Sequence, residues 1–473
     1  MPVPLSVQRI NSLLNSHSHH SSSKLFAART SAVSYVQTVK IIPNVHNAAL
    51  WLRPPLIAVN IFVSLPIIAS NWPQWRGPQG TGISSEQNLP LRWSTNENVR
   101  WRVPLPERGN STPIVWDQRA FITQAAENRR TVMCFKRDDG KLLWQSGVTY
   151  PEKEATHETN PLCSASPVTD GERVIASFGS AGLYCYDLYG KELWHRDLGK
   201  QAHIWGNGAS PIIHGDLGIL NFGPGERTFL IAVNKKTGQT IWQVDEPGGS
   251  LGEAKPGEKP DWVGSWSTPI VANLNAREEL VMSWPKRVAA YEPRTGKELW
   301  TCNGLNPLVY TSPLYSDGMV VAMGGFMGMA LAVKAGGSGD VTGTHRVWHH
   351  PKTKQRIGSG VIYDGHIYIV NDPGVAECYE LKTGKLIWEE RLVGQGPDNS
   401  SWSSMVWADG RLYAINHSGD TFVLKASPKF ELLAANSVGE PDNASLAVSD
   451  GDLFIRTHKA LWCIAESGRP RAK

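Results

Sequence analysis

Residues Ala290–Trp300 read Ala-Tyr-Glu-Pro-Arg-Thr-Gly-Lys-Glu-Leu-Trp, and close copies of this stretch recur along the chain. A small residue opens most copies, an acidic or amide residue usually follows two places later, a Thr-Gly or similar pair comes sixth and seventh, and Trp comes eleventh. Further copies begin at Cys134, Cys185, Ala232 and Cys378, and the copy at Cys185 is one residue shorter. The stretch is therefore the signature of an internal repeat.

Each copy predicts two β-strands joined by a tight hairpin. Alternating apolar residues flank the turn, and its Gly can adopt the positive φ that a short hairpin loop requires. The tryptophan then lies on the outer strand, and a ring that buries on the order of 150–250 Å² is too large for one thin sheet to cover. We therefore expect a tryptophan of each copy to dock against the neighbouring repeat, and the set is Trp101, Trp144, Trp194, Trp242, Trp300, Trp348 and Trp388.

The spacing of the repeat indicates a propeller. Self-similarity at a period of about 40 to 50 residues is typical of propellers and solenoids, and four short strands per unit favour the propeller. Seven repeats begin with a Ser- or Gly-rich approach to an inner strand, and several of them continue into an Asp-Gly turn. These approaches start at Ser111, Ser164, Gly208, Ser267, Thr311, Gly358 and Ser403.

The two ends of the repeat array complement each other. An eighth approach, Asn443–Leu446, leads through Leu461–Ile464 and provides three strands, while Asn98–Val103 carries Trp101 and has the character of a lone outer strand. Joining them removes open sheet edges that would invite aggregation. The sequence thus predicts an all-β fold over residues 71–468: an eight-bladed β-propeller of four-stranded antiparallel blades, closed by an N-terminal strand that completes the last blade.

Residues 1–70 are expected to form a disordered leader that ends in a signal-peptide-like segment, and residues 469–473 a short tail. The apolar run from Leu56 to Ala69 is short for a membrane span and suits the hydrophobic region of a secretory signal, with Ala69 or Ser70 before the cleavage site. This interpretation predicts a periplasmic or secreted protein that keeps no transmembrane domain after cleavage. An organellar transit peptide and a retained membrane anchor are the competing interpretations.

The charge balance argues against a nucleic-acid partner. The formal net charge is +4, but residues 1–70 contain five basic residues and no acidic one, so the rest of the chain carries a net charge of −1. Nucleic-acid binding normally needs a basic stripe. We expect a monomer whose partner is an unknown protein or a small molecule.

The six cysteines are expected to be structural. Cys134, Cys185, Cys378 and Cys463 occupy the first position of the repeat, which predicts small buried residues on a third strand. Equivalent positions of different blades lie too far apart to be bridged, so no disulfide is expected there. No haem or zinc spacing is present, and we expect no metal site.

The Thr-Gly-x-x-x-Trp repeat resembles that of pyrroloquinoline-quinone (PQQ)-like β-propellers, which are eight-bladed, over residues 72–468. The opening segment Trp72–Pro78 resembles the start of exported bacterial members of that superfamily. Quinoprotein alcohol dehydrogenases of the superfamily hold the quinone and calcium beside a disulfide between adjacent cysteines, and this sequence has no adjacent Cys pair, nor recognisable calcium ligands or base. The non-catalytic lipoprotein propeller of the outer-membrane barrel-assembly machine shares the repeat, although no Cys precedes Cys134 for lipid anchoring.

The loops that lead into the inner strands predict a binding funnel, because in this fold they converge on one rim of the central channel. They are rich in His, Asn, Trp and Arg, and the competing interpretation is that these groups only satisfy one another and the backbone. His157 and Glu158 could form an acid–base pair, but no nucleophile motif accompanies them. The candidate ligand-binding residues are Arg108, Asn110, His157, Glu158, Asn160, His203, Trp205, Asn207, Trp266, Tyr310, Arg356, Asn399, Trp402 and Asn443.

These observations favour an exported, non-catalytic PQQ-like propeller that acts as a ligand- or protein-binding scaffold through its central funnel, with no cofactor. The alternative is a PQQ-dependent dehydrogenase, which would use PQQ with calcium, or another enzyme acting on alcohols or sugars.

Overall fold

The computed structural model describes residues 71–249, 262–274, 277–326 and 328–468, so the predicted leader (1–70) and tail (469–473) lie outside the described residues. Within these ranges the chain forms β-strands and a single 3₁₀ turn, η1 (Gly179–Ala181). None of their helical segments has the length and apolar character that a membrane crossing requires.

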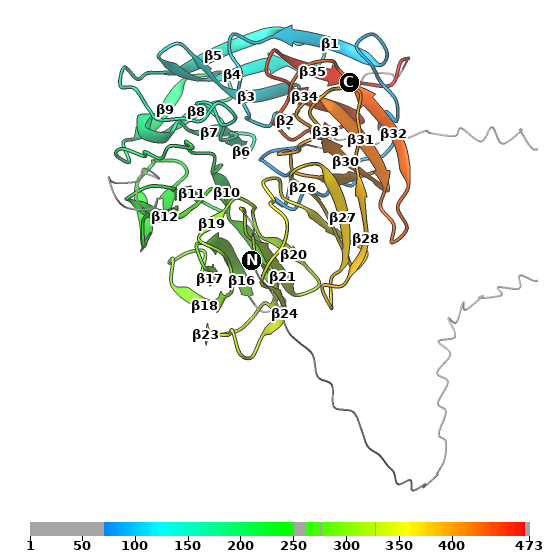
Figure 1. Cartoon of the computed structure of the whole chain (residues 1–473). Coiled ribbons are helices and arrows are strands. Elements are labelled where there is room, and N and C mark those ends of the chain that lie inside the picture. The colour runs from blue at the N-terminus through cyan, green and yellow to red at the C-terminus, as the bar shows by residue number, and fades with distance from the viewer. Residues whose placement is uncertain (1–70, 250–261, 275–276, 327, 469–473) are drawn as a thin grey trace, which may run out of the picture. The chain divides into compact units, whose positions relative to one another are not determined.

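Apart from the three short strands β14 (Gly264–Ser265), β19 (Leu308–Val309) and β23 (Gly339–Asp340), the described strands build eight antiparallel sheets, which we call blades 1 to 8 in chain order (Figure 1). Blade 1 consists of β2 (Ile114–Trp116), β3 (Arg119–Ala126), β4 (Arg129–Lys136) and β5 (Leu142–Thr149). Blade 2 consists of β6 (Val168–Thr169), β7 (Arg173–Ser177), β8 (Leu183–Asp187) and β9 (Glu192–Arg196). Blade 3 consists of β10 (Ile212–His214), β11 (Leu217–Phe222), β12 (Thr228–Asn234) and β13 (Thr240–Glu246). Blade 4 consists of β15 (Ile270–Leu274), β16 (Arg277–Trp284), β17 (Arg287–Tyr291) and β18 (Glu298–Asn303).

The second half of the ring repeats this pattern. Blade 5 consists of β20 (Leu314–Ser316), β21 (Met319–Met323), β22 (Ala330–Lys334) and β24 (Arg346–His350). Blade 6 consists of β25 (Val361–Tyr363), β26 (His366–Asn371), β27 (Val375–Glu380) and β28 (Leu386–Arg391). Blade 7 consists of β29 (Val406–Ala408), β30 (Arg411–Ile415), β31 (Asp420–Lys425) and β32 (Leu432–Ser437). Blade 8 consists of β33 (Ala447–Ser449), β34 (Asp452–Arg456), β35 (Ala460–Ile464) and β1 (Val99–Pro104).

The predicted eight-bladed propeller and its shared last blade are confirmed. Strand β1 pairs antiparallel with β35, from Val99 opposite Ile464 to Pro104 opposite Ala460, so the two ends of the described chain close the ring in one sheet (Figure 1). The first strands of the blades lie innermost, since first strands of neighbouring blades contact each other, as β2 does with β6 and β33 and as β25 does with β20 and β29. The four cysteines at the repeat's first position lie on third strands as expected, and all six cysteines are buried and free.

One addition to the repeat pattern was not predicted. A Gly-rich insertion between β22 and β24 contributes β23 (Gly339–Asp340), which pairs in parallel with β18 and extends blade 4. A second short parallel pair joins β14 (Gly264–Ser265) to β19 (Leu308–Val309), in the loops that lead into the inner strands of blades 4 and 5. Both additions link blades that are consecutive in the chain.

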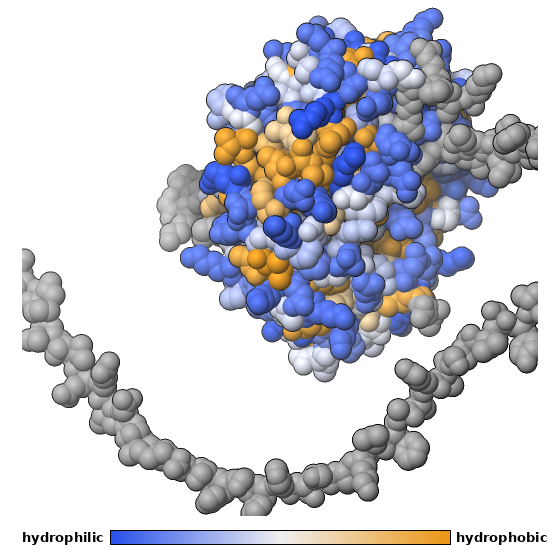
Figure 2. Space-filling view, turned by 90° about the vertical axis from the view of Figure 1, so that its right-hand side faces the viewer, coloured by the Kyte–Doolittle hydropathy of each residue, from blue (hydrophilic) through white to orange (hydrophobic). Residues whose placement is uncertain are grey.

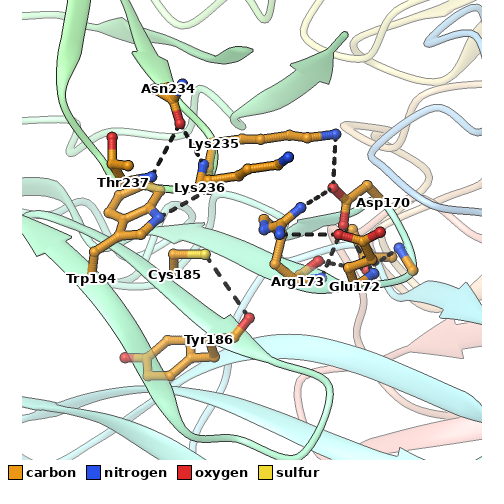
Figure 3. Close-up of polar contacts among 12 residues, drawn as sticks. Asp170, Glu172, Arg173, Cys185, Tyr186, Trp194, Asn234, Lys235, Lys236 and Thr237 are labelled. Atoms are coloured by element: carbon orange, nitrogen blue, oxygen red, sulfur yellow. Dashed lines mark hydrogen bonds and ion pairs between the residues drawn. The ribbon is translucent and has the colours of Figure 1, made fainter. Parts of the chain in front are cut away.

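Neighbouring blades meet at the repeat signature, as the junction of blades 2 and 3 shows (Figure 3). Trp194 Nε1 donates a hydrogen bond to the carbonyl of Lys235, 3.0 Å away in the turn of the next blade. The side chain of Asn234 shapes that turn by accepting from the amides of Lys236 and Thr237 at 2.9 and 3.1 Å (Figure 3). The acidic or amide residue of the signature is therefore a turn-forming residue.

The glycine of the signature lies directly against the tryptophan ring. Gly238 has φ +73°, and a Cβ placed on it would lie 2.7 Å from Cε3 of Trp194. The indole nitrogens of Trp101, Trp144, Trp242, Trp348 and Trp388 likewise donate to carbonyls of Arg137, Leu188, Pro293, Leu381 and Ser427 in the following blade. Trp300 differs, because its indole donates to the buried carboxylate of Glu279 within its own blade at 2.8 Å. In the next blade, blade 5, the Gly-rich insertion between β22 and β24 replaces the usual turn.

A closed ring of hydrogen bonds joins all eight blades at the channel. In each blade a Ser or Thr hydroxyl accepts from the backbone N–H of the equivalent residue in the preceding blade, at 2.8 to 3.2 Å. The cycle runs through Thr112, Ser166, Ser210, Thr268, Ser312, Ser359, Ser404 and Ser445, and returns from Ser445 to Thr112. We call these residues the hydroxyl ring. The residue that follows each of them in the chain is Pro in five of the eight blades.

The apolar cores lie between blades. Each cluster of buried side chains draws on the facing sheets of neighbouring blades, and the largest joins blades 7, 8 and 1. The outer strands face solvent on their other side, where the residue before the signature tryptophan is an exposed aliphatic such as Leu193 or Ile241. Figure 2 shows one side of the molecule, which is mostly hydrophilic with a gathered group of apolar side chains.

The contact between glycine and tryptophan allows a matched test. Gly318 has φ +72° and no atom within 4 Å of the point that a Cβ would occupy, whereas Gly238 has nearly the same φ and meets Trp194. Gly318→Ala should lower the free energy of unfolding by about 1–2 kcal/mol through backbone strain alone. Gly238→Ala should lower it by a further 1–3 kcal/mol, roughly, because the added methyl displaces the indole. Denaturant titration measures both, and equal losses would show that the junction does not depend on this contact.

Candidate functional site

A cavity of about 430 Å³ lies at the centre of the ring, and the loops leading into the inner strands of all eight blades line it. Its volume falls within the range of small-molecule sites, about 300–1,000 Å³. Five hydroxyl-ring residues, Thr112, Ser166, Ser210, Ser404 and Ser445, are part of the lining. The ring thus holds the loops whose side chains form the cavity wall.

One wall is aromatic. The ring centroids of Trp205 and Trp262 are 5.4 Å apart, those of Trp205 and Trp266 are 6.2 Å apart, and those of Trp266 and Tyr310 are 5.2 Å apart. Trp266 and Tyr310 directly follow β14 and β19, so the parallel pairing of these two strands places the rings side by side. The interplanar angles of 44° to 70° give tilted faces rather than a flat stack.

His203 supports this wall from behind. It is buried, its ring lies 5.0 Å from that of Trp266, and its Nδ1 accepts a hydrogen bond from the amide of Trp205 at 3.3 Å. Burial lowers the pKa of His203 to about 4, so the imidazole is neutral at neutral pH. His203 therefore positions aromatic side chains and adds no charge to the wall.

The opposite wall is polar, and its described residues include no Lys, Arg, Asp or Glu. Asn110 and Asn443 both donate through Nδ2 to the carbonyl of Thr159, at 2.8 and 3.2 Å, and His157 Nδ1 lies 2.7 Å from Thr159 Oγ1. Asn160 donates to the carbonyl of Trp205 at 2.6 Å, which ties the polar wall to the aromatic one. Asn110 Oδ1 is buried and has no protein hydrogen-bond partner in the described structure. A donor from a ligand would satisfy this oxygen.

Residues 72–93, which we call the strap, cross the end of the channel opposite to the loops that lead into the inner strands. Trp72 exchanges two backbone hydrogen bonds with Val115 in blade 1, at 2.9 and 2.8 Å, and the carbonyl of Pro73 accepts from Thr169 in blade 2. Gly82 accepts from Trp407 in blade 7, and the carboxylate of Glu86 accepts from the amides of Asp450 and Gly451 in blade 8. The strap therefore crosses the propeller before entering β1.

A second hollow of about 580 Å³ adjoins the cavity and shares Thr159 and Asn443 with it. Its lining carries charged groups, among them Arg108, Glu158, Asp398 and Asp420, together with His417 and His458. His417 Nδ1 lies 3.1 Å from Asp398 Oδ2, and its ring meets Trp402 edge-on at 5.3 Å. His417 and Trp402 thus stand where the charged hollow meets the neutral cavity.

The structure divides the fourteen predicted site residues into three groups. Asn110, His157, Asn160, Trp205, Trp266, Tyr310, Trp402 and Asn443 line the central cavity. Arg108 and Glu158 line the adjoining hollow, so His157 and Glu158 face different spaces and do not form the suggested acid–base pair across one site. His203, Asn207, Arg356 and Asn399 line neither hollow.

Three of these last residues, Asn207, Arg356 and Asn399, make hydrogen bonds inside the protein. Arg356 is buried and binds the carboxylate of Glu377 at 2.8 Å, inside blade 6. The carbonyl of Asn207 accepts from Asn160, and Asn399 Oδ1 accepts from the amide of Gly394 at 2.8 Å. These contacts are of the kind that the competing interpretation describes, in which loop polar groups satisfy one another and the backbone.

Sequence reasoning missed several lining residues, including Trp75, Phe326, Gln355 and Ile357. Trp75 belongs to the strap, which carries no repeat and bonds to blades far along the chain. The hydroxyl ring had a usable signal, because a Ser or Thr stands at the same register of all eight approaches.

The described lining does not fit PQQ, whose three carboxylates require cationic partners. It contains no Lys or Arg, and the cysteines are buried and non-adjacent, so none forms the disulfide platform of the dehydrogenases. The described residues also contain no group of three or more His, Cys, Asp or Glu side chains suited to a metal ion.

A family model described as outer membrane protein assembly factor BamB (PQQ_2) matches residues 92–222 and 226–469. The chain belongs to this family. The predicted relation to PQQ-like propellers is therefore confirmed.

Solved structures agree on the fold. BamB from Moraxella catarrhalis is 14% identical with a TM-score of 0.54, covering 77% of this chain and 98% of that one. Quinohemoprotein alcohol dehydrogenase from Comamonas testosteroni is 12% identical with a TM-score of 0.57, covering 85% and 82% of the two chains. At these identities both show a shared fold and nothing about activity.

A tetrathionate hydrolase from Acidithiobacillus ferrooxidans is 20% identical over 339 residues, which is 71% of this chain. The chain spans only about half, 55%, of that curated relative. The family match alone therefore places the chain among PQQ-like propellers.

Proposed function

We propose that this member of the BamB family is an exported, non-catalytic scaffold that binds a protein or small-molecule partner through its central cavity. The observation that carries the proposal is the cavity itself: loops from all eight blades converge on it, with an aromatic wall facing a neutral polar wall. A concave, mostly apolar space with a few convergent polar groups is what a binding site needs. The family description, an outer membrane protein assembly factor, supports a role in protein assembly.

The arrangement of ionisable groups favours binding over catalysis. General acid–base chemistry needs titratable groups within reach of one substrate. Among the described lining residues of the cavity, His157 is the one histidine and no carboxylate is present, while Glu158 lies in the adjoining hollow. The neutral cavity therefore suits recognition.

We further propose that the protein works in the periplasm or outside the cell after removal of a signal peptide. The strap supports this boundary, because Asn71 Oδ1 already accepts a hydrogen bond from the amide of Asp117 at 2.8 Å. Cleavage just before Asn71 would leave every strap contact intact.

Mass spectrometry of the protein from its native host tests this boundary. We expect a mature N-terminus near Asn71, because the apolar run before it is too short to span a membrane and ends in small residues. Recovery of the intact leader on protein in the cytoplasm would contradict the proposal.

The binding role is tested by substitutions in the aromatic part of the cavity. Trp205→Ala and Trp402→Ala should weaken binding of the partner that co-purifies from the native host by about tenfold or more, since each removes a large contact surface. Leu193→Ala, an exposed residue on the outer strand β9, is the matched control and should bind normally. Affinity capture followed by titration measures all three variants.

The non-catalytic part of the proposal predicts a second result. The protein supplied with PQQ and calcium should show no dye reduction with alcohols or sugars, because the described cavity offers no cationic partner for the quinone carboxylates. Substrate-dependent dye reduction that disappears in His157→Ala would overturn the scaffold proposal in favour of a dehydrogenase.

A further inference from the structure

The composition of the cavity wall constrains the charge of a ligand, because the described lining includes no Lys, Arg, Asp or Glu. Burying an ionised group without a compensating charge is costly. The imidazole behind the aromatic wall, that of His203, is itself kept neutral by burial. A ligand that enters this space completely is therefore favoured when it carries no net charge.

The two walls also constrain how apolar and polar groups are distributed on the ligand. The rings of Trp205, Trp266 and Tyr310 offer tilted apolar faces, whereas Asn110 and the hydroxyl ring offer neutral donors and acceptors. A hydrocarbon would leave the polar wall unsatisfied, and a fully polar solute would leave the indole faces without contacts. The walls match a molecule with an apolar ring face and neutral polar groups at its edge.

The strap also contributes to the cavity wall, through Trp75. Trp75 lines the central cavity and also a smaller hollow of about 190 Å³, which Gln74, Pro78, Ile212 and Thr268 border. Thr268 and Ser312 of the hydroxyl ring line this smaller hollow, so Trp75 stands where the channel would otherwise pass from one face to the other. The cavity is closed at its end by a side chain that belongs to no blade.

Arg76 fixes Trp75 in this place. Its guanidinium is buried and donates to the carbonyls of Gly80 at 3.3 Å, Thr81 at 2.6 Å and Ser359 at 3.2 Å, and its Cζ lies 5.8 Å from the centroid of the Trp75 ring. Burial lowers the pKa of Arg76 to about 9, so it remains cationic at neutral pH. The guanidinium presents its donors in a rigid fork and binds both the strap and the hydroxyl-ring residue Ser359. It therefore holds the strap against the hydroxyl ring.

We propose that the central cavity is a closed-ended site for an uncharged, amphipathic organic molecule, and that Trp75 of the strap is its floor and one of its contact residues. This inference rests on the proposed binding role of the cavity and names both its ligand class and a ligand contact outside the blades.

A matched pair of fluorescent probes tests the ligand class. N-phenyl-1-naphthylamine is uncharged, and 8-anilinonaphthalene-1-sulfonate has the same aromatic skeleton with an added sulfonate. The full chain should bind the neutral dye, and the sulfonate should bind about tenfold more weakly or worse because its charge finds no partner. Equal affinity for the two dyes, or no binding of the neutral dye, would show that the ligand class is wrong.

Three variants locate the site. Trp75→Ala and Trp266→Ala should each raise the Kd for the neutral dye about tenfold or more, because each removes an aromatic contact. Trp407→Ala is the control, since Trp407 is also half-buried and bonds the strap through its backbone, but does not line the cavity. It should change the Kd less than about twofold. Melting temperatures are measured in parallel, and Trp75→Leu replaces Trp75→Ala if the latter fails to fold.

The outcomes separate this inference from the proposed function. If Trp266→Ala weakens dye binding and neither Trp75 variant does, the cavity is the binding site but Trp75 is not part of it. If no cavity variant changes the Kd, the dye binds elsewhere and the proposed role of the cavity is wrong as well.

Discussion

Everything in this propeller depends on the hydroxyl ring. A blade cannot satisfy the amide that precedes its own inner strand, and the hydroxyl of the next blade does so, eight times in a closed cycle. Leaving one such buried amide without a partner would cost about 1–3 kcal/mol. Because the cycle returns from Ser445 to Thr112, the ring closes only when the last blade and the first are both in place.

The repeat supplies most of the stability, and the loops supply most of the cavity wall. The ring, the interblade cores and the junctions of glycine and tryptophan fix the inner strands, so the loops above them start from a rigid base. Those loops differ in length and composition from blade to blade, and they place indoles on one side of the cavity and amides on the other. The strap closes the opposite end of the channel, and its residues belong to none of the repeats.

The parts of the fold predicted from sequence are those with a periodic signal. The hairpin glycine, the turn-forming residue and the tryptophan recur at fixed spacing, so the blades and the shared last sheet followed from pattern and edge pairing alone. The pairing of β23 with β18 did not, since two residues of a Gly-rich insertion carry no strand signal. The strap was missed for a related reason: many of its bonds to blades at both ends of the repeat array are made through its backbone, and backbone bonds leave no mark in the sequence.

The site was harder to predict than the fold. Loop position identified the segments that surround the channel, but it could not show whether a side chain faces the cavity or a partner within the protein. Arg356 illustrates this, because its carboxylate partner Glu377 lies on β27, outside the loops that lead into the inner strands. His203 sits in the right loop and packs behind the indoles instead of lining the cavity.

Native-state hydrogen exchange tests the central claim, that the hydroxyl ring is the closure on which the structure depends. The amides of the eight ring residues should exchange together and only through global unfolding, and Ser312→Ala should speed exchange at all eight, because breaking one bond opens the cycle. Individual ring amides that exchange at separate, faster rates in the wild-type protein, or an effect of Ser312→Ala confined to Thr268, would contradict the account.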